Sequence, residues 1–266
     1  MPRYLAVLEY DGTDFSGSQV QANRRTVQGE LERALQVLAG ARSRVALAGR
    51  TDAGVHAWGQ VAAFDLWRPL DSRAASSALN ALLPRDVSVR EVAQVEAEFD
   101  PRRWAAGRRY VYRILNRRQR SALVERCAWH VPEPLDLEAM CQASRVLAGW
   151  HDFGAFGRPP QGNSTWRRLL RLDVSAAGDL VVVLAEADAF LRRMVRLLAG
   201  ALVDVGRGRR LPADLERAII GDGLQDRVSS AAPAKGLALA AVAYERERLG
   251  LGAGPWWSSE PLGGTG

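Results

Sequence analysis

A short polar turn between two apolar segments constrains the fold of this chain more than any other feature. The turn is Gly49-Arg50-Thr51-Asp52-Ala53-Gly54-Val55-His56, and apolar runs at 45–48 and 61–66 flank it. Apolar runs on both sides of a glycine-containing turn predict two strands joined by a tight connection. The two glycines permit backbone angles that other residues resist, and they let a bulky partner approach. The pattern therefore presents Asp52 on a rigid turn, although an aspartate in a turn more commonly caps its own backbone.

The first hundred residues predict an α+β arrangement. Residues 4–10 read as a strand that ends in the turn former Asp11, and Thr26 caps a helix that Gly40 ends. A helix over 71–83 and a strand over 87–92 follow the Asp52 turn. The order strand, helix, two strands, helix, strand favours a split arrangement with the helices on one face of an antiparallel sheet, as in RNA-recognition domains.

The second part of the chain continues with strands and helices. Tyr110 and Tyr112 alternate within a strand over 108–114, so both point to one face as half-buried side chains. His151 and Asp152 are expected to form a hydrogen-bonded pair at a helix-to-strand junction. Further predictions are a helix over 135–147, a hairpin over 165–175 and 180–187, a helix over 190–205 whose apolar face adjoins Arg192, Arg193 and Arg196, and a strand over 240–244.

These elements predict two halves, residues 1–105 and 106–248. The first half carries the Asp52 turn, and the second completes a cleft. Beyond residue 248 the composition shifts to Gly, Pro and Ser, which predicts a disordered tail over 249–266.

Composition narrows the class of protein. The chain has 36 basic and 30 acidic side chains, a net charge of +6 and a pI near 10.0, which favours a polyanionic partner. Two cysteines cannot build a disulfide framework, and three widely spaced histidines argue against a zinc site, so we expect no metal. No nucleotide-binding glycine motif occurs, and we expect no cofactor. No apolar run approaches the roughly 20 residues that cross a bilayer, and the chain starts as a strand, so a cytoplasmic protein without membrane contact is expected.

Several sequence blocks resemble one known family in the same order. The run GRTDAGVHAWGQVAAF resembles the signature of the tRNA pseudouridine synthase A family, and the segments YDG, RTVQ, HDFGAF, FLRRMVR and APAKGLAL are similar to its other blocks, over about residues 3 to 246. The chain departs from the pattern at Ser18, where the family usually has Trp, and at Asp100 and Pro101, where it usually has His and Ala. Arg102, which follows them, matches the family. The resemblance implies the pseudouridine synthase fold, a mixed, mainly antiparallel central sheet flanked by helices, with two halves like RNA-recognition domains.

The resemblance also implies roles for individual residues. Asp52 corresponds to the catalytic aspartate, Arg196 to the arginine that pairs with it, and Tyr110 to the aromatic residue that stacks on the target base, with Tyr112 as a supporting neighbour. Arg50 would insert where the flipped nucleotide has left the stack. The substrate-binding residues implied in this way, including those that hold phosphates, are Arg50, Tyr110, Arg102, Arg24, Arg25, Arg167 and Arg168. The implied substrate is uridine 38, 39 or 40 of the tRNA anticodon stem-loop, bound by a homodimer in which one tRNA touches both subunits.

The chemistry of this isomerisation agrees with the motifs. The bond between the uracil nitrogen and the ribose breaks, the base turns, and it rejoins through carbon, so no atoms are gained and no redox group is needed. The reaction requires a carboxylate, a dry pocket and an exposed base. A neighbouring Arg196 would stabilise the ionised form of Asp52. The sequence does not decide whether Asp52 attacks the uracil ring or the ribose.

Other functions are open at this point. A non-catalytic tRNA-binding chaperone of the same fold would use Asp52 only as a turn residue. A hydrolase of glycosidic bonds would need a second acid, for which Asp11 is the only nearby motif candidate. An aspartic protease would need a second Asp-Thr/Ser-Gly arm, which the sequence lacks.

Overall fold

The fold is α+β, as the sequence predicts. The computed structural model describes residues 1–40, 43–160, 162–220 and 228–245, and these form five α-helices, two short 3-10 helices and ten strands. The predicted tail, 249–266, lies outside the described residues. The described residues divide into two compact units, Met1–Ala106 together with 239–245, and Gly107–Ala238. The last strand therefore lies mostly in the first unit, whereas the sequence analysis assigned it to residues 106–248.

The sheet of the first unit carries the Asp52 turn at the start of one of its inner strands. Its strand order is β4-β1-β3-β10, and β2 pairs with β3. β1 is antiparallel to both β3 and β4, with Leu5 opposite Ala63 and Ala93. The bounds are β1 Arg3–Tyr10, β2 Ala46–Leu47, β3 His56–Asp65, β4 Val87–Val95 and β10 Leu237–Tyr244.

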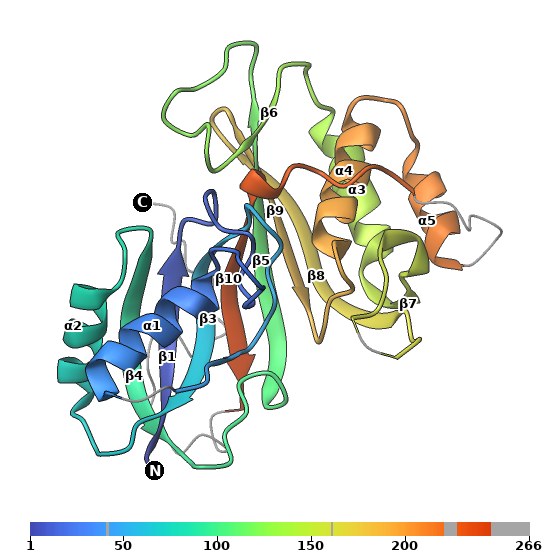
Figure 1. The fold of residues 1–266 in the computed structure, drawn as a ribbon. Helices are drawn as coiled ribbons and strands as arrows, with labels where there is room; N and C mark the ends of the chain where they lie inside the picture. The colour runs from blue at the N-terminus through green and yellow to red at the C-terminus, as the bar shows by residue number, and fades with distance from the viewer. Residues whose placement is uncertain (41–42, 161, 221–227, 246–266) are drawn as a thin grey trace. The chain divides into compact units, whose positions relative to one another are not determined.

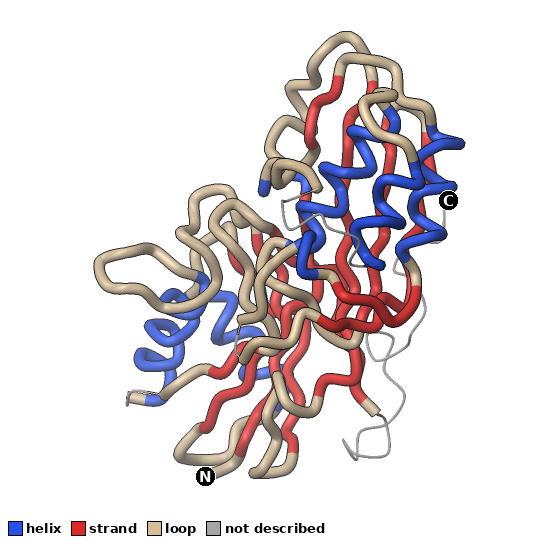
Figure 2. Tube along the Cα trace, turned by 90° about the vertical axis from the view of Figure 1, so that its right-hand side faces the viewer, coloured by secondary structure: helices blue, strands red, loops and turns tan. Residues whose placement is uncertain are grey.

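Two capped helices cover one face of this sheet (Figures 1 and 2). α1, Val27–Ala39, begins where the Thr26 hydroxyl accepts the Gly29 N–H at 3.2 Å, and it ends at the left-handed Gly40, as predicted. α2, Ser72–Leu82, is capped by Asp71, whose carboxylate accepts two backbone N–H groups at 3.0 Å each. Both helices turn apolar residues inward, among them Val27, Leu31, Leu35, Ala75 and Leu79.

The second unit has a mixed, mainly antiparallel sheet of order β5-β9-β8-β7, with β6 parallel to β5. Residues 181, 183, 185 and 187 of β9 are buried, and the residues between them are half-buried. This alternation shows that one face of the sheet is covered. The bounds are β5 Ala105–Asn116, β6 Trp129–Val131, β7 Gly149–Asp152, β8 Trp166–Ala177 and β9 Leu180–Ala187.

Three α-helices pack together in the second unit (Figure 1). They are α3 Leu137–Leu147, α4 Met194–Gly206 and α5 Pro212–Ile220, and the 3-10 helices are η1 Gly154–Phe156 and η2 Ala234–Gly236. α4 is buried on nearly all sides, which is typical of a core helix. None of the described helices combines the length and the apolar character that a membrane crossing requires.

Two predictions for the second unit are wrong in detail. The helix predicted from Phe190 begins at Met194, because Arg193 adopts a left-handed backbone (φ 64°) and Arg192 forms an isolated bridge with Arg158. The predicted His151–Asp152 pair does not form. His151 Nε2 contacts the Ala148 carbonyl at 2.9 Å and Asp152 accepts the Gly154 N–H at 2.9 Å, because neighbouring residues of a strand point to opposite faces.

Candidate active site

The Asp52 turn has the tight geometry that the glycines predict. The Val55 N–H donates to the Asp52 carbonyl at 3.2 Å, and Gly54 takes a positive φ of 78°. Thr51 and Val55 are buried, at 7% and 3% exposure, and Asp52 between them is half-buried. The turn is therefore anchored on both sides of the residue that it presents.

A segment from the β1–α1 connection binds the side of the turn that precedes Asp52. The Ser18 hydroxyl accepts the Thr51 N–H at 2.8 Å, and the Ser18 N–H donates to the Thr51 carbonyl at 3.1 Å. The Thr51 hydroxyl shares a 2.8 Å hydrogen bond with the phenol of Tyr10. Ser18 is fully buried and Tyr10 nearly so. Both polar groups of the Thr51 backbone are thus bonded to Ser18.

Gln60 reinforces the same side from inside β3. Its side chain donates to the Gly49 carbonyl at 2.8 Å and accepts the Gly49 N–H at 3.2 Å, and it also donates to the Tyr10 phenol at 3.4 Å. Burial raises the pKa of Tyr10 to about 12, and the hydrogen bonds to Thr51 and Gln60 oppose this rise. Tyr10 therefore stays a neutral phenol at physiological pH.

Two glycines allow the β1–α1 connection to lie directly against the turn. A Cβ on Gly12 would stand 2.0 Å from the Val55 carbonyl oxygen, and one on Gly17 would stand 2.9 Å from the Thr51 carbonyl oxygen. Gly17 also has a φ of 101°, which side chains rarely adopt. The connection thus contacts both ends of the turn through positions that only glycine fits.

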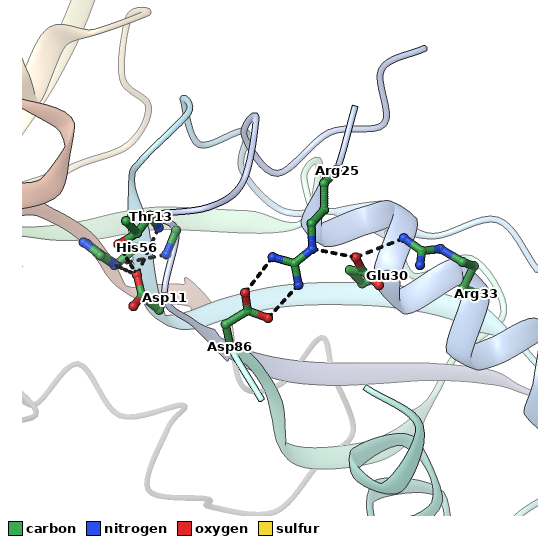
Figure 3. Close-up of polar contacts among 8 residues, drawn as sticks. Asp11, Thr13, Arg25, Glu30, Arg33, His56 and Asp86 are labelled. Atoms are coloured by element: carbon green, nitrogen blue, oxygen red, sulfur yellow. Dashed lines mark hydrogen bonds and ion pairs between the residues drawn. The ribbon is translucent and has the colours of Figure 1, made fainter. Parts of the chain in front are cut away.

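Asp11 serves as a turn former, as predicted, and also lies beside His56 (Figure 3). Its carboxylate accepts the Thr13 N–H at 3.0 Å and the Thr13 hydroxyl at 2.5 Å. His56 Nδ1 lies 3.2 Å from the same carboxylate oxygen and accepts the Gly12 N–H at 3.1 Å. Since His56 follows Val55, these contacts anchor the side of the turn that follows Asp52.

The arginines of the first unit differ in their surroundings. Arg25 pairs with both oxygens of Asp86, at 2.7 and 2.9 Å, and with Glu30 at 2.9 Å (Figure 3), and its hydrogen bonds to Asp86 raise its pKa. Arg24 and Arg50 are exposed, and Arg50 lies two residues before Asp52. Arg102 is half-buried in a turn that Asp100 caps by accepting the Arg102 N–H at 2.9 Å. Arg25 thus already has carboxylate partners within the chain.

The two tyrosines of β5 are more buried than the sequence predicts. Tyr110 is 9% exposed, and its ring meets Phe190 edge to face with centroids 5.1 Å apart. Tyr112 is fully buried, and its hydroxyl donates to the Pro233 carbonyl at 2.8 Å. Burial raises the pKa of Tyr112, and the charge of Arg196 partly opposes this rise. The charge of Arg196 therefore acts on the Tyr112 hydroxyl.

Arg196 lies in the first turn of α4. Its Nε donates to the Ala232 carbonyl at 2.7 Å, and its own carbonyl accepts the Ala232 N–H at 2.9 Å. These two bonds fix the side chain against the segment that precedes η2. The guanidinium is thereby oriented by the backbone of its own unit.

Arg167 and Arg168 cannot act as one cluster on one face, because adjacent residues of β8 point to opposite sides of the sheet. Arg168 is exposed and pairs in register with Trp150, which is also exposed. Arg167 is half-buried and donates to the Ser164 carbonyl at 3.1 Å. Over the residues for which coordinates are described, no group of three or more His, Cys, Asp or Glu side chains could hold a metal ion.

Comparison with known proteins identifies the family. The sequence profile of the tRNA pseudouridine synthase family matches residues 6–102 and 143–245. The chain belongs to this family. The tRNA pseudouridine synthase A of Myxococcus xanthus is 48% identical over 246 residues, which cover 92% of this chain and 92% of that protein. That of Xanthobacter autotrophicus is 45% identical over 246 residues, which cover 92% of this chain and 100% of that protein.

A solved structure of a Cbf5-Nop10-Gar1 complex contains a chain that aligns with a TM-score of 0.31 and 12% identity. The alignment covers 75% of this chain and 54% of that one, and we draw nothing from it. Membership confirms the family resemblance, the pseudouridine synthase fold and the assignment of the chain to the isomerases that act on tRNA. The roles of Asp52, Tyr110, Arg196 and the seven substrate-binding positions stay predictions.

Sequence reasoning missed the polar residues that hold the turn. Ser18 entered only as a departure from the family pattern, and Tyr10 and Gln60 entered only within the matching blocks YDG and GRTDAGVHAWGQVAAF, with no role of their own. A signal for Gln60 is present, because a glutamine within the apolar strand 56–65 must find hydrogen-bond partners when it is buried. No comparable local signal marks Ser18.

Proposed function

We propose that this chain converts uridine to pseudouridine at positions 38, 39 and 40 of the tRNA anticodon stem-loop, with Asp52 as the catalytic carboxylate. One observation carries the proposal. In a chain of the tRNA pseudouridine synthase family, buried groups hold both sides of the Asp52 turn. Ser18 binds the Thr51 backbone, Tyr10 binds the Thr51 hydroxyl, and Gly12 lies directly against the Val55 carbonyl. Such preorganisation is what a catalytic group requires, and a plain turn aspartate does not need it.

The remaining predicted residues have separate tasks in this proposal. The target base leaves the stack, because its reacting atoms are inaccessible within a helix. Tyr110 stacks on the flipped base, and Arg50 fills the space that the base has left. Arg196 stabilises the charge of Asp52, and its fixed orientation by Ala232 supports that task. Arg24, Arg102, Arg167 and Arg168 are the proposed phosphate contacts. Arg25, which the resemblance also implies, is left out of this set because Asp86 and Glu30 already hold its guanidinium.

The test uses an unmodified tRNA transcript with the wild-type protein and with Asp52→Asn. Pseudouridine is mapped by carbodiimide labelling and primer extension. We expect signal at the anticodon stem-loop from the wild type and none from the variant. Asp71→Asn is the matched control, because it makes the same change at an exposed helix cap that asparagine also serves.

Retained modification by Asp52→Asn contradicts the catalytic assignment. Tight tRNA binding without modification by either protein instead supports a chaperone of the same fold. Release of free uracil supports a hydrolase. Pseudouridine elsewhere in the tRNA would support the proposed reaction and contradict the proposed positions.

We further propose that the active form is a homodimer in which one tRNA touches both subunits. Light scattering coupled to size exclusion measures the mass of the free protein and of its tRNA complex. A complex of two chains with tRNA supports this proposal, and a complex of one chain contradicts it.

A further inference from the structure

Ser18 makes three hydrogen bonds that join two elements of the first unit to the residue before Asp52. Its hydroxyl accepts the Thr51 N–H at 2.8 Å and its N–H donates to the Thr51 carbonyl at 3.1 Å. Its carbonyl accepts the Gln28 N–H in the first turn of α1 at 2.9 Å. Ser18 is thus fixed to a helix on one side and fixes Thr51 on the other.

The geometry of the peptide bond connects this contact to Asp52. The Thr51 carbonyl belongs to the planar peptide group that ends at the Cα of Asp52. A hydrogen bond to the Thr51 N–H and another to its carbonyl together restrain both backbone torsions of Thr51. Ser18 therefore fixes the orientation of the peptide group that leads into Asp52.

The side chain of Ser18 is essential to this restraint. Ser18 is 0% exposed and Thr51 is 7% exposed, so bulk water does not replace a lost acceptor for the Thr51 N–H. The position is also one where the chain departs from the family pattern, which usually has tryptophan there. Loss of the Ser18 hydroxyl would leave the Thr51 N–H without this acceptor.

We propose that Ser18 is a positioning residue for Asp52. It touches neither substrate nor reacting atoms, and it acts through the Thr51 backbone. The inference rests on the proposed catalytic role of Asp52.

The experiment measures the single-turnover rate of pseudouridine formation at saturating enzyme, the Kd for tRNA and the Tm. For Ser18→Ala we expect the rate to fall by about 10- to 100-fold, because a displacement of about 1 Å costs up to about 100-fold in rate. The Kd should stay within about twofold, because Ser18 is fully buried. Ser18→Cys fills nearly the same volume with a weaker acceptor, so its rate should lie between those of the wild type and Ser18→Ala. This variant also tests the inference if Ser18→Ala does not fold.

Two controls separate positioning from stability. Ser43→Ala removes a serine bond to the Asp65 carbonyl, 2.9 Å long, in the same unit but away from the turn. Gly40→Ala lowers stability at the end of α1, where nothing lies within 4 Å of the new Cβ. Both should keep the wild-type rate at temperatures well below their Tm.

A wild-type rate in folded Ser18→Ala and Ser18→Cys overturns the inference. A loss of rate in Gly40→Ala equal to that in Ser18→Ala overturns it as well. Asp52→Asn is measured in parallel. If it alone loses activity, the proposed function stands and the positioning role fails; if it keeps activity, the proposed function itself fails.

Discussion

The side chain of Gln60 binds the backbone of Gly49 twice, as donor to its carbonyl at 2.8 Å and as acceptor from its N–H at 3.2 Å. Gln60 is fully buried in β3, and Gly49 opens the segment that leads to Asp52. A primary amide is the side-chain group that can satisfy both backbone groups of one residue at once. This pairing ties the entry of the Asp52 turn to the centre of the sheet.

Gln60→Leu should lower the free energy of unfolding by about 1 to 3 kcal/mol, because it leaves the N–H and carbonyl of Gly49 without these partners. Urea unfolding measures the change. Asn80→Leu is the matched control, since Asn80 binds the N–H and carbonyl of Val89 in the same way at 2.8 and 2.7 Å, but at an exposed position. The control should cost less, because Asn80 itself is exposed and the Ser76 hydroxyl still donates to the Val89 carbonyl at 3.3 Å. An equal cost at both positions contradicts the role assigned to burial.

Gly12→Ala should destabilise the protein more than Gly40→Ala. The new Cβ at position 12 would stand 2.0 Å from the Val55 carbonyl oxygen, so the β1–α1 connection must move away from the turn. At position 40 the Cβ meets nothing within 4 Å, and only the left-handed φ of 66° is unfavourable, at about 1 to 2 kcal/mol. Thermal unfolding of both variants checks the order. The reverse order would show that the β1–α1 connection can move away from Val55 without a loss of stability.

Tyr10→Phe should change how stability depends on pH. The pKa of Tyr10 in the folded protein is about 12, above the ordinary value of 10.0, because burial disfavours the phenolate. The stabilisation linked to this shift is therefore fully present below pH 10 and is lost as the pH rises toward 12. Urea unfolding across this range should show the free energy of the wild type falling more steeply than that of Tyr10→Phe. Groups common to both proteins cancel in the difference, and parallel curves contradict the shift.

Capping and turn residues predicted those elements whose ends are decided by residues nearby in the sequence. The limits of α1 followed from Thr26 and Gly40, because capping needs only residues within one turn. The Asp52 turn followed in the same way from Gly49 and Gly54. The strand predicted before it, over 45–48, is confirmed in part, because Ala46–Leu47 pairs with β3 and the Ala48 N–H donates to the Val61 carbonyl at 2.8 Å.

Contacts between distant residues could not be read from local patterns. The Ser18–Thr51 bond joins positions 33 residues apart, and the restraint on Asp52 depends on it. The start of α4 was predicted too early for the same reason, since the bridge from Arg192 to Arg158 overrides a continuous apolar period. Family resemblance supplied Asp52, Tyr110 and Arg196, and none of their roles follows from periodicity.

Arg24 and Arg25 should respond differently to replacement by methionine, although they are adjacent. Arg24 is exposed, whereas Arg25 binds Asp86 and Glu30 and lies 4.2 Å above the ring of Phe15. Arg25→Met should therefore lower the free energy of unfolding, by about 1 kcal/mol because its side chain is 37% exposed and water screens the pairs. Arg24→Met should leave stability unchanged.

The tRNA affinities should show the opposite pattern. If Arg24 contacts a phosphate, its loss weakens binding and reduces the slope of log K against log salt by about 0.7 to 0.9, the value for one phosphate contact. Arg25→Met should leave this slope unchanged, because a guanidinium that is already held by two carboxylates releases no counterion from the RNA. Filter binding at several salt concentrations measures both slopes. A reduced slope for Arg25→Met would show that tRNA displaces Asp86 or Glu30 from Arg25, so that the ion pairs seen here belong to the free protein alone.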